Sequence, residues 1–205
     1  MSAPPFVLFR DDLAGHETLF ENPSELIVAD EESAFSDAFD RAERARAAGR
    51  WLAGYVSYEA GYLLEPKLRP VLPGNRRAPL VCLGVFDGPA ERAPALRPSP
   101  ATNGPIFDAR ATWAFEDYRR RFDALHRHLR LGDCYQGNLT FPVEAGWTGD
   151  PLAAFDALTG RQPVRYGALV SLESPVVLSR SPELFFQVDS DGMIETLPMK
   201  GTAPR

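Results

Sequence analysis

The chain has 205 residues, of which 44% are hydrophobic, and its formal net charge at pH 7 is −6. A chain of this length and apolar content can build a substantial core, either as one domain or as two small lobes. The negative charge argues against nucleic acid or an anionic membrane as the main partner, and no run of about 18 apolar residues predicts a membrane span.

The N-terminal residues and the cysteines favour a cytoplasmic protein. The first six residues, Met-Ser-Ala-Pro-Pro-Phe, lack the basic region and the long apolar stretch of a secretory signal. Cys82 and Cys134 lack the spacing of a metal or redox motif. We therefore expect two free thiols in a reducing compartment.

The first part of the chain combines short apolar runs with one amphipathic helix. The apolar runs predict strands at residues 6–9, 26–29, 51–58 and 80–86. Residues 33–49 are predicted to form a helix, with Ser33 as the cap at its start and Gly49 at its end. Its apolar side chains recur at helical spacing: Phe35, Ala38, Phe39, Ala42 and Ala45. Residues 87–105 are rich in Pro, Ala and Gly, which is typical of a connector or a long surface loop.

The clearest helix pattern covers residues 115–131, and Gly132 stands at its end. The apolar stripe that defines this helix consists of Tyr118, Phe122, Leu125 and Leu129. His126 and His128 suggest a metal site, but residues two apart on a helix do not share a face. We therefore expect both histidines to be solvated.

Strands are predicted on both sides of this helix and again toward the end of the chain. The candidate segments are residues 106–112, 133–144, 165–173 and 175–179, the last two as adjacent antiparallel strands. Asp150 is expected to cap a short helix over residues 150–158. Many strands with about three helices, in no strict alternation, predict an α+β protein.

A turn signal separates two apolar runs near the end of the chain, residues 184–188 and 193–199. The residues between them, Asp189-Ser190-Asp191-Gly192, predict a β-hairpin. A two-residue loop would place Glu183 opposite Lys200, whereas a four-residue loop would place Glu183 opposite Pro198, diagonal to Lys200. Both registers put Glu183 and Lys200 on one face of the hairpin, but a three-residue loop would put them on opposite faces.

A carboxyl group and an amine at the open end of a hairpin can serve two purposes. They can form a surface ion pair, which is worth well under ~1 kcal/mol. They can also act as a nucleophile beside a general acid, which requires a deprotonated Lys200 and a protonated Glu183. Gly201 and Thr202 add a flexible backbone donor and a hydroxyl beside the amine, and the spacing alone leaves both readings open.

Two sequence motifs resemble those of a known family. Ser181-Pro182-Glu183-Leu184-Phe185, followed by Leu197-Pro198-Met199-Lys200-Gly201-Thr202-Ala203-Pro204-Arg205, resembles the central motif of the chorismate-utilising enzymes. Gly132-Asp133-Cys134-Tyr135-Gln136-Gly137-Asn138-Leu139-Thr140 resembles a second motif of that family, in the expected order. Within the family, the sequence around Lys200 resembles component I of aminodeoxychorismate synthase. Anthranilate synthase and the isochorismate and salicylate enzymes usually carry Ala at this position.

The resemblance implies roles for five residues. Lys200 would be the nucleophile and Glu183 the general acid and base. Gly201, Thr202 and Gln136 would contact the substrate. Gln136 stands where hydroxylating relatives carry a lysine that activates water, so the pattern suits an enzyme that uses ammonia.

The resemblance also implies a fold and a domain order. The family fold is a layered antiparallel β-sheet sandwich with flanking helices, as in anthranilate synthase component I. We expect residues 1–87 to form an N-terminal lobe, 88–105 a Pro-rich connector and 106–205 the first part of the chorismate-binding domain. Family members are much longer than this chain, so we expect it to correspond to the N-terminal part of such an enzyme and to be inactive alone.

A substrate, a partner and a cofactor follow from the same resemblance. The substrate would be chorismate, and a glutamine amidotransferase subunit would supply ammonia for the para-aminobenzoate branch of folate biosynthesis. Mg²⁺ would be held by acidic residues of the part that this chain lacks, so no metal ligand is expected here. Chorismate is a dianion and needs cations, and Arg180, Lys200 and Arg205 lie near the proposed site in sequence.

Three alternatives remain open. Anthranilate synthase component I aminates C2 of chorismate instead of C4, and Lys200 disfavours it. Isochorismate or salicylate synthesis is disfavoured by both Gln136 and Lys200. The third alternative is a non-catalytic lobe that docks a glutaminase or holds tryptophan.

Overall fold

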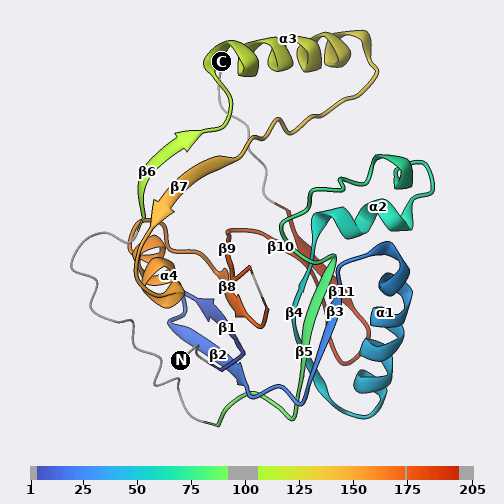
Figure 1. The fold of residues 1–205 in the computed structure, drawn as a ribbon, viewed down its shortest axis with the longest axis vertical. Helices are drawn as coiled ribbons and strands as arrows, with labels where there is room; N and C mark the ends of the chain where they lie inside the picture. Colours follow the sequence, from blue (N-terminus) through green and yellow to red (C-terminus); the bar gives the residue numbers. More distant parts are fainter. Residues whose placement is uncertain (1–3, 92–105, 174, 199–205) are drawn as a thin grey trace. The chain divides into compact units, whose positions relative to one another are not determined.

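The computed structural model describes residues 4–91, 106–173 and 175–198 and shows helices with antiparallel sheets (Figure 1). The expected α+β fold class is confirmed. The chain divides into two compact units, residues 1–97 with 158–205 and residues 98–157. The first unit joins segments from both ends of the chain, because β1 (Phe6–Asp11) pairs with β8 (Tyr166–Ser171).

The first sheet of the first unit has the strand order β2-β1-β8-β9 and is antiparallel throughout. Its outer strands are β2 (His16–Glu21) and β9 (Val177–Ser181). The inner strand β1 is covered on both faces, since Val7 and Leu8 point to opposite sides and both are fully buried. A strand buried on both faces has a continuous apolar run in sequence, as residues 6–9 do.

The second sheet of this unit has the strand order β3-β5-β4 and is also antiparallel. Its elements and the helix that covers it are β3 (Glu25–Ala29), β4 (Trp51–Val56), β5 (Val81–Phe86) and α1 (Glu32–Ala47). On one face, Ala38 of α1 packs with Ile27 in a buried cluster. On the other face, Phe86 packs with Val7 and Val170 of the first sheet. The first unit is therefore a helix on a two-sheet sandwich, with apolar cores between the layers.

Shorter elements complete the first unit. They are α2 (Gly61–Leu64), two 3₁₀ turns at Tyr58–Ala60 and Arg69–Val71, and the strands β10 (Leu184–Val188) and β11 (Ile194–Leu197). Among the strands that the structure describes, β10 and β11 pair only with each other, as the predicted hairpin requires.

The second unit contains β6 (Ile106–Ala111), α3 (Phe115–Leu131) and β7 (Val143–Trp147), together with most of α4 (Pro151–Thr159). α3 has the predicted bounds, and Gly132 ends it in the left-handed conformation at φ +79°. The predicted cap of α4 is also confirmed, because the Asp150 carboxylate accepts a hydrogen bond from Ala153 N–H at 2.8 Å.

Several features differ from the sequence analysis. Ser33 was expected to cap the helix that follows it, but it lies inside α1, which begins at Glu32 after the N-cap residue Glu31 and has no side-chain cap hydrogen bond. The strand predicted for residues 133–144 is wrong, since β7 begins only at Val143 and the preceding residues pack along α3. A Cβ on Gly137 would lie 2.7 Å from Leu125, and Phe141 stacks on Trp113 at 5.4 Å between ring centroids. The strand β2 was not predicted, because its sequence has one short apolar pair and takes its conformation from pairing with β1.

Candidate active site

The tip of the β10–β11 hairpin has a three-residue loop. Val188 pairs with Ile194, and Asp189 N–H donates to Met193 O at 3.1 Å. The Asp189 carboxylate accepts hydrogen bonds from the N–H groups of Asp191 and Met193, each at 2.9 Å. Extended down a regular hairpin, this register would place Glu183 and Lys200 on opposite faces.

A β-bulge in β10 changes the pairing at the base of the hairpin to the register of a four-residue loop. Gln187 pairs with Glu195, but Leu184 pairs with Leu197, so β10 contributes one extra residue between these pairs. The pairing of Leu184 with Leu197 is the one that a four-residue loop would give, in which Glu183 falls opposite Pro198. A three-residue loop and a bulge therefore have the combined effect of the longer loop.

Glu183 lies in the two-residue link between β9 and β10. Its N–H donates to Ser181 Oγ at 3.2 Å, and the Ser181 hydroxyl donates to the Glu183 carbonyl at 2.9 Å. Glu183 is exposed. Its proposed partner Lys200, with Gly201 and Thr202, lies outside the described residues, so the shared pocket of amine and carboxyl stays a prediction.

Gln136 belongs to the second unit. It is exposed and lies in the irregular segment that packs along α3, one residue before the close contact of Gly137 with Leu125. In the same unit Phe141 touches Tyr118 at 5.9 Å between ring centroids. Glu183 and Gln136 are thus presented by different compact units, and the role of Gln136 as a substrate contact stays a prediction.

Arg180 is held by the first unit. It donates to the Asp12 carboxylate at 2.5 Å, to Thr159 Oγ1 at 3.0 Å and to the Gln162 carbonyl at 2.8 Å. The side chain of Asp12 is only 3% exposed. Arg180 was expected as a cation near the site, whereas Asp12 was not recognised, because an acidic pair after a strand is an ordinary turn sequence.

The charge state of Asp12 follows from its surroundings. Burial alone would raise the pKa of its carboxyl. The hydrogen bond from Val164 N–H at 2.7 Å, the hydrogen bond and charge of Arg180, and the charge of Arg10 together outweigh burial and lower the pKa below its ordinary value. Asp12 is therefore a carboxylate at neutral pH.

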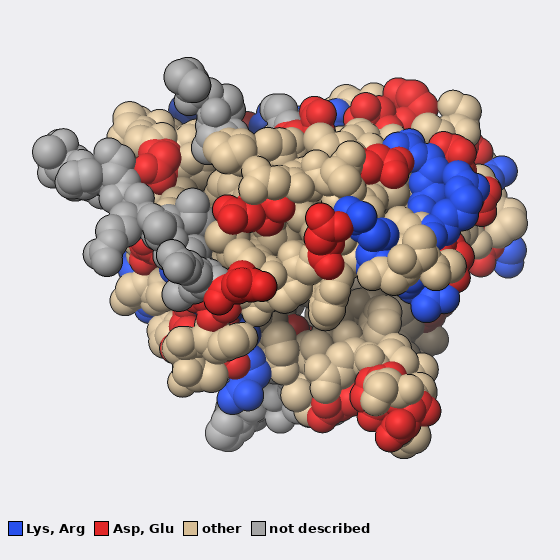
Figure 2. Space-filling view, turned by 90° about the horizontal axis from the view of Figure 1, so that it is seen from below, with Lys and Arg blue, Asp and Glu red and all other residues tan. Residues whose placement is uncertain are grey.

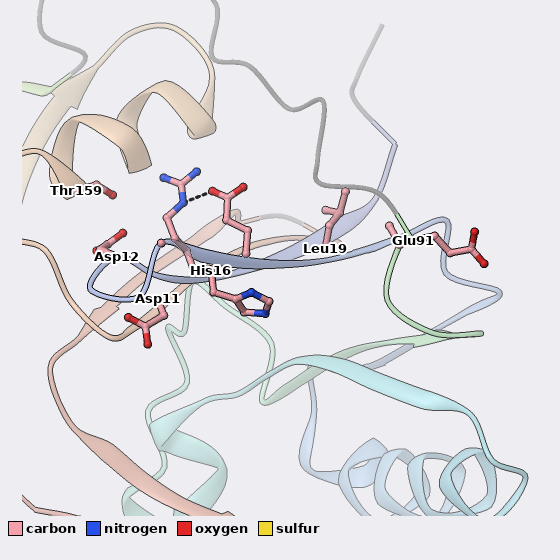
Figure 3. A pocket seen from close by; sticks show the side chains of 10 residues that line it. Asp11, Asp12, His16, Leu19, Glu91 and Thr159 are labelled. Carbon is pink, nitrogen blue, oxygen red and sulfur yellow. Dashed lines mark hydrogen bonds and ion pairs between the residues drawn. The ribbon is translucent and has the colours of Figure 1, made fainter.

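A surface pocket of about 630 Å³ adjoins Asp12 (Figure 3). It is lined by Arg10, Asp11, Asp12, Gly15, His16, Glu17, Leu19, Ala90, Glu91 and Thr159. Its carboxylates are largely engaged, since Glu17 pairs with Arg10 and Asp11 accepts hydrogen bonds from the N–H groups of Leu13 and Ala14. The pocket contains none of the residues to which the sequence analysis gave a catalytic or substrate-binding role.

Positive side chains gather in one part of the surface seen in Figure 2. A groove of about 600 Å³ beside the C-terminal half of α1 is lined by residues that include Arg41, Arg44 and Arg50. Arg41 pairs with Glu25 at 2.6 Å, and Arg50 pairs with Asp87 at 2.8 Å. This groove is therefore largely neutralised by its own neighbours.

The two cysteines are free thiols, as expected. Burial, with a further contribution from the charge of Glu173, raises the pKa of Cys82 to about 11. Burial likewise raises the pKa of Tyr55, which pairs with Cys82 across the second sheet, to about 12. Both groups are neutral at physiological pH and belong to the core rather than to a reactive site.

The described residues contain no group of three His, Cys, Asp or Glu side chains that could hold a metal ion. His128 instead lies 2.8 Å from the Asp133 carboxylate, and His126 stacks on Phe122. Among the described helices, none has the length and apolar character needed to cross a membrane.

Comparison with known proteins identifies similar sequences. A family model described as chorismate binding enzyme matches residues 4–205. Aminodeoxychorismate synthase component 1 of Klebsiella aerogenes is 35% identical over 129 residues, which cover 61% of this chain and 28% of that protein.

Two further relatives carry the names of two different enzymes. Aminodeoxychorismate synthase component 1 of Escherichia coli K12 is 39% identical over 90 residues, covering 44% of this chain and 20% of that protein. Anthranilate synthase component 1 1 of Haloarcula marismortui is 37% identical over 90 residues, covering 44% of this chain and 18% of that protein. The matched stretches thus span less than a third of each relative.

Proposed function

This chain belongs to the chorismate-binding enzyme family, and from that premise we propose that it acts in an aminodeoxychorismate synthase. In this proposal it is the component that aminates chorismate at C4, with ammonia from a glutamine amidotransferase subunit. The product would enter para-aminobenzoate and folate biosynthesis in the cytoplasm. Relatives named as component 1 of this enzyme, at 35–39% identity, support the proposal.

The observation that carries the proposal is a lysine in the central motif. Lys200 stands between Pro198-Met199 and Gly201-Thr202, at the position where anthranilate synthases usually carry Ala. An amine at this position can form a covalent bond with the substrate, which an alanine cannot. The lysine therefore favours amination at C4 through a covalent intermediate.

The proposed reaction has two displacement steps. The free amine of Lys200 attacks C2 of chorismate, the two ring double bonds shift, and the C4 hydroxyl leaves as water after protonation by Glu183. Ammonia then adds at C4, the two double bonds shift back, and the amine of Lys200 is expelled from C2. Glu183 accepts a proton in this second step, which returns both side chains to their starting states.

Glu183 is exposed, whereas a general acid must hold a proton near neutral pH. A carboxyl group holds a proton near neutral pH only when it is desolvated or faces another negative charge. We propose that the bound substrate covers Glu183 and supplies this environment.

The family also implies Mg²⁺. The described residues do not fit a metal ion, since no three potential ligands converge. No step of the proposed reaction is therefore routed through the metal.

The test is a turnover assay of the full-length enzyme that carries this sequence, with chorismate, Mg²⁺ and ammonium, and with the product identified by mass and fluorescence. Lys200→Ala should abolish or redirect amination at C4. Full C4 amination by the Lys200→Ala variant would remove Lys200 as the nucleophile.

A second candidate is amination at C2, as in anthranilate synthase. It is favoured by the Haloarcula marismortui relatives, which carry that name at 35–37% identity. The same assay separates the two reactions, because anthranilate and aminodeoxychorismate differ in mass and fluorescence. The absence of any product would instead favour a binding lobe.

A further inference from the structure

The Asp12–Arg180 ion pair is almost entirely buried. The side chains are 3% and 13% exposed, and the closest approach of nitrogen to oxygen is 2.5 Å. The second Asp12 oxygen, Oδ1, is buried without a hydrogen-bond partner. Most of the favourable interactions of this carboxylate therefore come from Arg180 and from Val164 N–H.

The pair joins segments that are far apart in sequence. Asp12 lies in the turn after β1, and its N–H donates to Val164 O at 2.9 Å. Arg180 lies in β9 and reaches the end of α4 through Thr159 Oγ1 and the following loop through the Gln162 carbonyl. The planar guanidinium can satisfy these acceptors in only one orientation, so the pair fixes the end of β9.

The motif that carries Glu183 starts at the next residue. Ser181 follows Arg180, and its hydroxyl contacts both the N–H and the carbonyl of Glu183. A continuous series of contacts thus runs from Asp12 through Arg180 and Ser181 to the Glu183 backbone. Because Glu183 is only three positions after Arg180, a displacement of Arg180 would also displace Glu183.

We propose that Asp12 and Arg180 are positioning residues for Glu183. The pair holds the β9–β10 corner so that the Glu183 carboxyl faces the substrate in one orientation. Arg180 therefore acts through the protein rather than as a cation that binds chorismate. The inference rests on the proposed acid–base role of Glu183.

The experiment compares Asp12→Asn, Arg180→Met and Arg180→Lys with Arg41→Met. Arg41 is a matched control, because it also donates to a carboxylate, Glu25, and to a backbone carbonyl, Leu26 O. Arg41 lies on α1, away from the motif in sequence. Arg180→Lys keeps the charge but loses the planar fork, so the fold is expected to survive in this variant.

The first readout is amide hydrogen exchange of Glu183 and Leu184 by NMR in the 205-residue chain. Asp12→Asn and Arg180→Met should raise exchange at these two amides while the amides of β5 keep their protection. Arg41→Met should leave both regions unchanged. Unchanged exchange at Glu183 and Leu184 in both Asp12→Asn and Arg180→Lys would overturn the inference.

The second readout is amination by the enzyme that carries this sequence. Loss of the pair should lower kcat by up to about 100-fold, shift the pH profile of kcat and leave KM unchanged. Arg180→Lys should restore part of kcat. A raised KM with unchanged kcat would overturn the inference and identify Arg180 as a substrate cation. Absence of amination in the parent enzyme would count against the proposed function, and the exchange measurement would still decide whether the pair positions Glu183.

Discussion

The ion pairs of this protein differ most in the solvent exposure of their side chains. Arg46 and Glu43 lie 2.6 Å apart, yet their side chains are 68% and 62% exposed. Solvent and salt screen such a pair, so its removal should have no measurable effect on stability. The Asp12–Arg180 pair is nearly enclosed, and loss of one member would leave the other charge buried without compensation.

The lowered pKa of Asp12 predicts the pH dependence of stability. Its carboxyl binds a proton less readily in the folded chain than in the unfolded chain. The stabilisation is therefore fully present above the ordinary pKa and is lost as the pH falls through the lower, folded pKa. We expect the free energy of unfolding to decrease below about pH 4, with a shallower decrease in Asp12→Asn.

Urea unfolding at a series of pH values measures this effect. Glu43→Gln is the control, because it removes a carboxylate whose pKa is also lowered, by Arg46, but on the exposed face of α1. An acid decrease of equal steepness in Asp12→Asn and in the unmodified chain would show that other carboxyl groups carry the dependence.

At the scale of elements, local patterns were sufficient for the longest helix and for buried strands. α3 was predicted to its last residue because an apolar stripe and a terminal glycine coincide, and Gly132 does adopt the left-handed conformation. Contacts with distant segments decided the rest. Residues 133–142 have the composition of a strand, but Gly137 and Phe141 pack against α3 and the segment containing Trp113 instead.

Gly54 tests the tight fit between β4 and β5. Its φ is +152°, and a Cβ would lie 2.1 Å from the Cys82 carbonyl oxygen. Because the obstacle is backbone, Gly54→Ala must displace the two strands, and we expect a loss of about 2–4 kcal/mol in the free energy of unfolding. Urea unfolding measures the loss.

Gly61→Ala is the matched control for this substitution. No atom lies within 4 Å of a Cβ at Gly61, and its φ of −61° suits any residue. An equal loss of stability in both variants would show that the contact with Cys82 does not determine the change.

At the scale of the whole molecule, the two motifs could be recognised in the sequence, but the compact unit to which each belongs could not be predicted. Glu183 lies in the unit made of residues 1–97 and 158–205, and Gln136 lies in the unit made of residues 98–157. Motif order along the chain carries no information on which segments pack together. The bulge in β10 was equally hidden, because two adjacent phenylalanines, Phe185 and Phe186, resemble any apolar strand.

The pairing of β1 with β8 predicts how shortened chains behave. Residues 1–157 lack β8, which pairs with β1 and buries Val7 together with Val170. We expect this shortened chain to lose cooperative urea unfolding and to bind a hydrophobic dye, because an inner strand would lose one of its two neighbours.

Residues 1–183 provide the comparison, because they keep β8 and β9 and lack only the segment that begins with the β10–β11 hairpin. The described strands of that hairpin pair only with each other, and none of their residues belongs to the two buried clusters. The unfolding midpoint of this chain should therefore stay close to that of residues 1–205. Equal loss of cooperativity in both shortened chains would contradict this expectation and mean that the hairpin supports the sandwich.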